Sequence, residues 1–326
     1  MFIEILLFII GIGLLYYGAN MLVKNSSWLA KSVGVSPLII GMTVVAFGTS
    51  APELLVSTIA SIEHNSAIAF GNIIGSNIAN IGLVLGLVVL IWPPKSEERA
   101  VRREFPFLVL ISLLLIVLCS DGMLGRVDGF VLIVLFSLFL YYNIITVRRK
   151  MLDKFKHEVE EFGDKLEGVI EHRRFERKRV LKNLAFAIVG LAILLLGSKL
   201  LVDSAIAIAR VAGISQMVIG LSLVAVGTSL PELFTSVIAS IKKEEQINVG
   251  MILGSNIFNT LFILGVAAMI LPIPVTRQDF IVSMPVMLLF ILSVFPILKE
   301  NIRTYRLFGL FLLLGYFTFI IYSFIR

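Results

Sequence analysis

The stretch "GTSAPELLVS" occupies residues 48–57 and places a carboxylate, Glu53, inside a long apolar segment. The stretch "GTSLPELFTS" at residues 227–236 does the same with Glu232. An ionised side chain at membrane depth is costly, so such a residue normally faces a cavity or pathway and has a partner. The two stretches therefore indicate where in the chain a function should be sought.

The segments around them are typical of a membrane protein. The chain has 326 residues, of which 58% are apolar, and its mean hydropathy is +0.99. Apolar runs long enough to cross a bilayer recur from end to end, which predicts an all-α polytopic membrane protein. We expect ten transmembrane helices, at 2–23, 36–62, 67–91, 105–120, 127–147, 180–202, 214–241, 247–271, 280–298 and 306–324. The first has no Lys or Arg before its apolar run, so we interpret it as a retained span and not a signal peptide.

The basic residues predict the orientation. With ten spans, all but five of the 28 Lys and Arg fall on one side of the membrane, the exceptions being Arg126, Lys199, Arg210, Arg277 and Arg326. The positive-inside rule makes the basic side cytoplasmic, so both termini face outward. The net charge of +6 is thus explained by topology, and it does not indicate a nucleic-acid partner.

The chain contains an internal repeat. Residues 41–62 and 220–241 are identical at 14 of 22 positions, and the same interval aligns "GSNIAN" (75–80) with "GSNIFN" (254–259). This predicts two homologous halves, 1–147 and 180–326, joined by a charged cytoplasmic linker at 148–179. Each half has five spans, and an odd number gives the halves inverted topology, as in many secondary transporters. A merely structural duplication is the alternative, but the best-matched positions are polar.

Pro52 predicts a break in the second span. Proline removes an amide donor and disfavours helix at the residue before it, which frees carbonyls near Ala46. The Ser50–Glu53 spacing matches a capping box that would start a new half-helix. The predicted result is two half-helices that meet at the midplane. In the alternative interpretation, Ser50 and Glu53 only cap a kink, although a glutamine would serve that purpose at lower cost in lipid.

The third and eighth spans carry further polar groups. Ser76 and Asn80 are four residues apart and share a helical face. Ser255 and Asn259 repeat this arrangement in the second half, and we expect all four to be ligands. Asn77 and Asn256, like Gly75 and Gly254, fit helix packing equally well.

Together these groups predict a site for a hard cation. The candidate donors are all oxygens: two carboxylates, hydroxyls of Thr and Ser, amides of Asn, and backbone carbonyls. Calcium takes about six to eight such ligands in flexible geometry, whereas softer metals favour Cys or His. The chain has a single cysteine, Cys119, and its three histidines lie in loops or at span ends. Two ion species that compete for two carboxylates would suit an antiporter.

At these residues the chain resembles the sodium/calcium exchangers of the cation/calcium exchanger superfamily. "GTSAPE" with "GSNIAN" and "GTSLPE" with "GSNIFN" match the paired alpha repeats of that family, and the resemblance extends over nearly the whole chain. It implies exchange of three sodium ions for one calcium, with the first and sixth spans sliding against the other eight. It also implies calcium ligands at Glu53, Glu232, Thr49, Thr228 and the carbonyls of Ala46 and Ala225. Sodium would add Ser50, Ser76, Ser229 and Ser255, and Asn80 and Asn259 would complete the middle of the site.

Two departures from the family bear on this expectation. The position of Asn259 is Asp in some prokaryotic relatives and in the potassium-dependent branch, so Asn here lowers the charge of the site. The linker 148–179 is too short for the calcium-sensing domains of the large animal exchangers. We interpret it as a solvated tether; a calmodulin-like or lipid-headgroup role for its basic end, "HRRFERKRVLK" (172–182), is the alternative.

The expected function is therefore electrogenic extrusion of calcium across the plasma (inner) membrane of a prokaryotic cell. The partners are calcium, sodium and membrane lipid, with no cofactor, no obligate protein partner and no enzymatic activity. The first alternative is a calcium/proton antiporter on the same fold, although that branch usually lacks the Thr–Ser pair. The second is an ion channel. An intramembrane hydrolase is disfavoured because Ser50 or Ser229 would need a base, and no His or Lys lies near them at membrane depth.

Overall fold

The computed structural model describes residues 2–92, 98, 100–162, 166–211, 225–298 and 305–325, and most of these are helical. Among the described residues, seven helical runs are long and apolar enough to cross a membrane, and one bent pair of helices would make an eighth. The runs are Phe2–Val33, Ser66–Ile91, Arg126–Asp153, Arg177–Val211, Glu245–Ile270, Asp279–Leu298 and Tyr305–Ser323. The polytopic helical membrane fold predicted from composition is thus confirmed.

The secondary structure is as follows. The helices are α1 (Phe2–Val33), α2 (Pro37–Ile40), α3 (Ala46–Thr49), α4 (Ala51–Ile62), α5 (Ser66–Ala79), α6 (Gly86–Ile91), α7 (Phe105–Leu118), α8 (Arg126–Phe162), α9 (Leu166–Val211), α11 (Ala225–Thr228), α12 (Leu230–Ile241), α13 (Glu245–Phe258), α14 (Leu264–Ile270), α15 (Met284–Leu298) and α16 (Tyr305–Ile325). Strands β1 (Met123–Leu124) and β2 (Ile273–Pro274) pair antiparallel. Turns of π-helix lie at Gly41–Val45, Asn80–Leu85, Ala100–Glu104, Asn259–Ile263 and Asp279–Ser283.

Several expected spans differ in length from the prediction, and α1 runs to Val33 where the expected span ends at residue 23. Helices α8 and α9 continue far beyond 127–147 and 180–202, so the charged linker is helical up to Phe162 and again from Leu166. Conversely, α7 has 14 residues and α12 only 12. The part of the expected seventh span that precedes Ala225 lies outside the described residues.

The backbone repeats at the interval of the sequence repeat, 179 residues. Helix α4 begins at Ala51 and α12 at Leu230, and both run for 12 residues. The π-helical turns that begin at Asn80 and Asn259 are related in the same way, as are those at Ala100 and Asp279. Within the described part of the chain, the two non-glycine residues with positive φ, His64 and Lys243, are equivalent as well. The two halves therefore share local structure as well as sequence.

The second span is broken where Pro52 predicts it. The run Pro37–Thr49 and helix α4 meet at Ser50 with an angle of 46°. In the second half, α11 and α12 are separated at Ser229, with Pro231 in the first turn of α12. Because an interrupted helix at membrane depth is tolerated only when buried in protein or lining a cavity, these breaks mark the interior.

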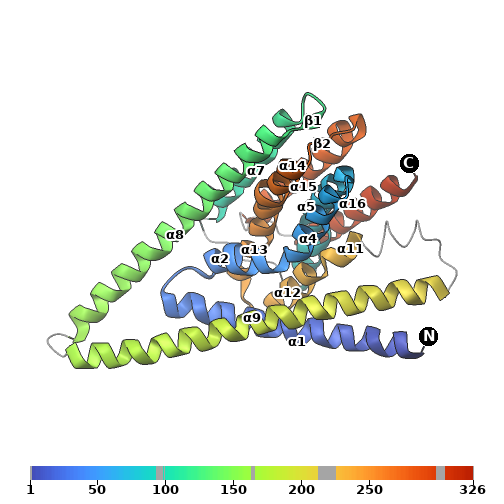
Figure 1. Cartoon of the computed structure of the whole chain (residues 1–326). Helices are drawn as coiled ribbons and strands as arrows, with labels where there is room; N and C mark the ends of the chain where they lie inside the picture. The colour runs from blue at the N-terminus through green and yellow to red at the C-terminus, as the bar shows by residue number, and fades with distance from the viewer. Residues whose placement is uncertain are drawn as a thin grey trace.

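Helices α1 and α9 run antiparallel, side by side, along one edge of the molecule (Figure 1). Their backbones approach closely at two glycine pairs. A side chain at Gly18 would place its Cβ 2.7 Å from the carbonyl oxygen of Gly190, and one at Gly197 would lie 3.0 Å from that of Gly11. Only glycine permits this spacing, so the pair packs as one unit through small residues.

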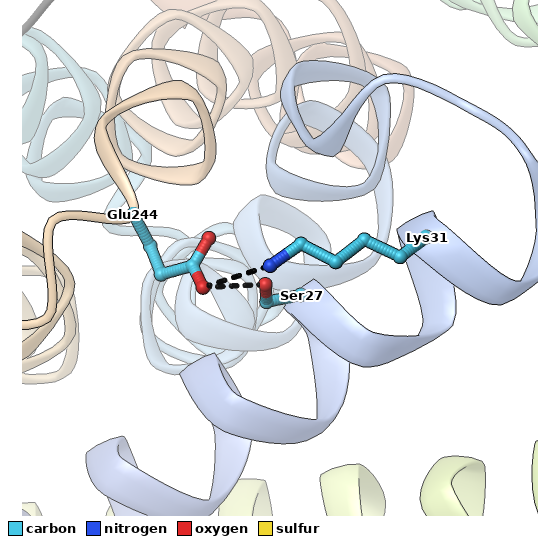
Figure 2. Close-up of polar contacts among 3 residues, drawn as sticks. All are labelled: Ser27, Lys31 and Glu244. Carbon is cyan, nitrogen blue, oxygen red and sulfur yellow. Dashed lines mark hydrogen bonds and ion pairs between the residues drawn. The ribbon is translucent and has the colours of Figure 1, made fainter.

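The far end of α1 is tied to the turn between α12 and α13. Ser27 Oγ donates a hydrogen bond of 2.6 Å to Glu244 Oε1, and Lys31 Nζ lies 3.5 Å from the same oxygen (Figure 2). Ser27 is buried, whereas the Lys31 side chain is 66% exposed. The buried hydrogen bond between Ser27 and Glu244 therefore contributes more to stability than the exposed ion pair between Lys31 and Glu244.

Candidate functional site

The two glutamates lie in the first turns of α4 and α12 and are both 1% exposed. Each of these helices contacts a π-helical turn of the other half: α4 contacts Asn259–Ile263 and α12 contacts Asn80–Leu85. Glu232 accepts a hydrogen bond from Ser50, three residues before Glu53, so the two carboxylates belong to one site. The local reason is the break before each proline, which turns the first residues of α4 and α12 toward the centre of the protein.

Hydroxyl groups surround each carboxylate. Ser76 Oγ donates to Glu53 Oε1 at 3.4 Å, and Ser50 Oγ donates to Glu232 Oε1 at 3.0 Å. The hydroxyl of Thr228 also interacts with Glu53 and that of Thr49 with Glu232. Three of these four contacts join the two halves, so the site exists only where they meet.

The predicted capping box is wrong. Ser50 is the residue before α4, but its side chain makes no capping hydrogen bond, and neither does that of Ser229 before α12. Instead, the Ser50 hydroxyl is directed at the Glu232 carboxylate. A short-range pattern suggested a local partner for Ser50, whereas the partner with the stronger, charge-assisted attraction is 182 residues away.

The carbonyl freed by Pro52 is not that of Ala46. The oxygen of Ala46 accepts from the Ser50 amide at 3.0 Å and from Thr49 Oγ1 at 3.3 Å. Because the missing amide of a proline would have bonded four residues back, the freed oxygens belong to Gly48 and Gly227. Ser198 Oγ donates to the Gly227 oxygen at 3.1 Å. A ligand role for the Ala46 carbonyl stays a prediction and requires Thr49 to release it; for Ala225 the structure describes only its place at the start of α11.

Six of the predicted ligand residues carry a buried oxygen with no hydrogen-bond partner. These atoms are Glu53 Oε2, Glu232 Oε2, Ser229 Oγ, Ser255 Oγ, Asn80 Oδ1 and Asn259 Oδ1. Leaving such groups unsatisfied costs about 1–3 kcal/mol each and more for charged groups, and a cation bound between them would offset this cost. Buried oxygens with free lone pairs on both halves are what a hard cation needs.

Sequence reasoning missed the role of Asn77. It is completely buried, its Oδ1 accepts from Asn259 Nδ2 at 3.2 Å, and its Nδ2 donates to Thr260 Oγ1 at 2.9 Å. Asn77 thereby fixes which way the Asn259 amide faces. Asn72 was missed as well, and its Nδ2 bonds the Glu53 carbonyl oxygen at 3.4 Å and Ser57 Oγ at 3.0 Å. A polar residue within an apolar span was the available signal for both.

The donor set has few charges. Among the described residues, no group of three or more His, Cys, Asp or Glu side chains lies close enough to hold a metal ion. The two glutamates are therefore the charged members of the site, and neutral hydroxyls and amides complete it. Such a site suits cations that are bound and released, because oxygen ligands of low charge hold calcium less tightly than clusters of carboxylates.

Comparison with known proteins gives the family. The sequence model described as "Sodium/calcium exchanger protein" matches residues 3–145 and 182–325. This chain belongs to the sodium/calcium exchanger family.

The relatives of this exchanger-family chain extend over most of its length. It is 30% identical over 349 residues to the sodium/calcium exchanger MaX1 of Methanosarcina acetivorans, which covers 99% of both chains. It is 36% identical to the inner membrane protein YrbG of Escherichia coli, over 82% of this chain and 79% of that one. The solved structure of the sodium-calcium exchanger NCX_Mj soaked with zero Na⁺ and Ca²⁺ superposes with a TM-score of 0.80, at 33% identity over 99% of each chain. The family resemblance expected from the repeats is confirmed, and the protein is a membrane antiporter of the cation/calcium exchanger class.

Proposed function

We propose that the protein exchanges sodium for calcium across the membrane and that it extrudes calcium electrogenically. The observation that carries this proposal is the pair of buried carboxylates with unpartnered oxygens, surrounded by hydroxyls and amides of both halves. One calcium ion neutralises two glutamates. Three sodium ions on the same groups would leave one positive charge, so each cycle would move net charge.

The ligands follow from this proposal. Calcium is held by Glu53 and Glu232, with Thr49, Thr228 and the carbonyls of Ala46 and Ala225. Sodium ions use the same glutamates together with Ser50, Ser229, Ser76 and Ser255, and Asn80 and Asn259 complete the centre of the site. Support comes from the contacts between halves at Ser50 and Ser76 and from the unpartnered oxygens of Ser229, Ser255, Asn80 and Asn259.

The proposed architecture has ten transmembrane helices in two inverted five-helix repeats, 1–147 and 180–326, joined by the cytoplasmic linker 148–179. The repeated bounds of α4 and α12 and of the π-helical turns support the two halves. Packing supports their inversion: Gly11 meets Gly197 and Gly18 meets Gly190, and a shift of 179 residues converts one pair into the other. Such exchange of partners is what a twofold axis in the membrane plane produces.

In this proposal the protein lies in the cell membrane with both termini outside the cell. The ion gradients supply the driving force, so the cycle requires no cofactor, and the partners are the two ions and membrane lipid.

The test is uptake of radioactive calcium into proteoliposomes loaded with sodium. We expect uptake to follow the outward sodium gradient and to grow faster when the membrane potential favours sodium exit. Glu53→Gln and Glu232→Gln should each reduce calcium uptake at least about 100-fold, because each removes one of the two charged ligands. A loss of this size corresponds to about 2.7 kcal/mol. Glu63→Gln is the matched control, because Glu63 is exposed in the turn after α4.

Two results would contradict the proposal. Uptake that follows a pH gradient and ignores sodium would make the protein a calcium/proton antiporter on this fold. Near-normal exchange in both glutamate variants would remove the cation site from α4 and α12.

A further inference from the structure

A cavity of about 500 Å³ lies in the groove between α1 and α9, and none of the cation-site residues lines it. One wall is the stretch Asn20–Trp28 of α1, and the other is Arg179–Phe186 of α9. Its volume is in the range of pockets that bind small molecules, about 300–1,000 Å³. The groove is therefore large enough for a ligand that the exchange reaction does not involve.

The cavity is strongly positive. Lys24, Arg179 and Lys182 line it, and none of its described lining residues is a carboxylate. Lys24 also acts outside the cavity: the pKa of Lys242 is lowered by burial and then by the charge of Lys24, and Glu244 offsets part of this effect. A ligand that balances this charge must be an anion.

Aromatic rings flank the cations. The Arg179 guanidinium lies 5.4 Å from the centre of the Trp28 ring, and Lys182 Nζ lies 5.8 Å from that of Phe186. The cavity lies where the charged sequence 172–182 of α9 gives way to its apolar stretch. Tryptophan and long cations at such a boundary are typical of the headgroup level of a bilayer.

We propose that this cavity binds the phosphate headgroup of an anionic phospholipid. The three cations contact the phosphate, and the acyl chains follow the apolar surfaces of α1 and α9, whose exposed faces include Tyr17 and Val189. Basic pockets between membrane helices on the cytoplasmic side are suited to such headgroups. A zwitterionic lipid is disfavoured because its ammonium group would meet the same three cations.

Trp28 provides a direct reporter. The chain has two tryptophans, Trp28 and Trp92, so Trp92→Phe leaves fluorescence from the cavity wall alone. This chain is reconstituted in mixtures of phosphatidylglycerol and phosphatidylcholine, with bromine on the acyl chains of one lipid or the other, and quenching is measured. We expect brominated phosphatidylglycerol to quench Trp28 at a lower mole fraction than brominated phosphatidylcholine. Each cation near an anionic surface is worth about fivefold in binding.

Substitutions locate the effect. Lys182→Gln should reduce the preference for phosphatidylglycerol by about fivefold, and Lys24→Gln with Lys182→Gln should reduce it further. Lys178→Gln removes the same charge from the same exposed part of α9 without touching the cavity and should leave the preference unchanged. The quenching measurement does not require exchange activity, so its result is independent of the proposed function.

Three outcomes would overturn the proposal. The first is equal quenching by the two lipids when all three cations are present. This measurement uses no charge substitution, so it holds even if the double variant folds poorly. The second is an equal loss in Lys178→Gln, which would indicate general attraction to the surface. The third is abolition of the preference by millimolar inorganic phosphate at constant ionic strength, which would make the ligand a free phosphate.

Discussion

The serine hydroxyls at the centre of the protein have the same sequence context but different contacts. Ser50 and Ser76 each donate to a glutamate, whereas their repeat equivalents, Ser229 and Ser255, have unpartnered oxygens. Residue types and spacing were enough to predict which residues gather around Glu53 and Glu232. Which hydroxyl contacts which carboxylate could not be predicted. Three of the four contacts join the two halves, and a sequence repeat does not indicate how the halves are placed relative to each other.

Asn77 provides a test at the residue scale. Asn77→Ala leaves Asn259 Nδ2 and Thr260 Oγ1 without their partner, and each such loss costs about 1–3 kcal/mol. We expect a lower unfolding temperature. We also expect slower calcium exchange, with a smaller loss than in the glutamate variants. Asn256→Ala is the matched control, since Asn256 is the repeat equivalent and its Nδ2 bonds only Ile252 of its own helix in the described contacts. Equal effects of the two substitutions on unfolding temperature would show that Asn77 positions nothing.

At the scale of elements, glycines set the close approaches between helices. Beside the site, a Cβ at Gly250 would meet the Leu38 carbonyl oxygen and one at Gly254 that of Met42, and glycines have the same role between α1 and α9. The apolar periodicity of the sequence predicts that both helices span the membrane. Their length and their mutual approach could not be predicted, because charged residues continue a helix as readily as apolar ones once it has left the membrane.

Gly18 tests the close approach. In Gly18→Ala the new Cβ would lie 2.5 Å from the backbone nitrogen of Leu194, so the two helices must move apart. We expect lower yield and a lower unfolding temperature in detergent. Gly13→Ala serves as control, because nothing lies within 4 Å of its Cβ and alanine favours helix by about 1 kcal/mol. A Gly18→Ala protein as stable as Gly13→Ala would disprove the tight packing.

The contact of Glu244 with α1 tests a second element. Glu244→Gln weakens the hydrogen bond from Ser27 and removes the ion pair with Lys31. A contact worth about 1 kcal/mol should protect the end of α1 about fivefold, so we expect faster amide hydrogen exchange in residues 24–33. Glu245→Gln, which alters the neighbouring carboxylate bound to Trp92 Nε1 instead, should leave that segment unchanged. Identical exchange in the two variants would rule out a role for Glu244 in holding α1.

The whole molecule is a chain whose two halves repeat each other in sequence, helix bounds and π-helical turns. Periodicity and the interval of 179 residues were sufficient to predict this organisation. They could not predict that the expected fourth and seventh spans yield helices of 14 and 12 residues, because hydropathy is insensitive to turns of π-helix and to breaks at proline.

Orientation is tested with the single cysteine. Cys119 is 1% exposed, so Cys119→Ser gives a background without thiols in which single cysteines can be placed. Lys178→Cys and Arg126→Cys both lie at exposed positions, on opposite sides in the proposed topology. We expect an impermeant maleimide to label Arg126→Cys in intact cells and Lys178→Cys only after the membrane is opened. The reverse pattern would place the termini in the cytoplasm.

The break at Ser50 and its counterpart at Ser229 have one more consequence. Each starts a fresh helix of 12 residues with a glutamate in its first turn. Peptide dipoles give the amino-terminal end of a helix about half a positive elementary charge. The two carboxylates therefore face roughly one opposing charge that belongs to the backbone and never leaves. Between the departure of one ion and the arrival of the next, this fixed charge lowers the energy of the empty anionic site, and a bound ion can therefore leave at a lower energetic cost.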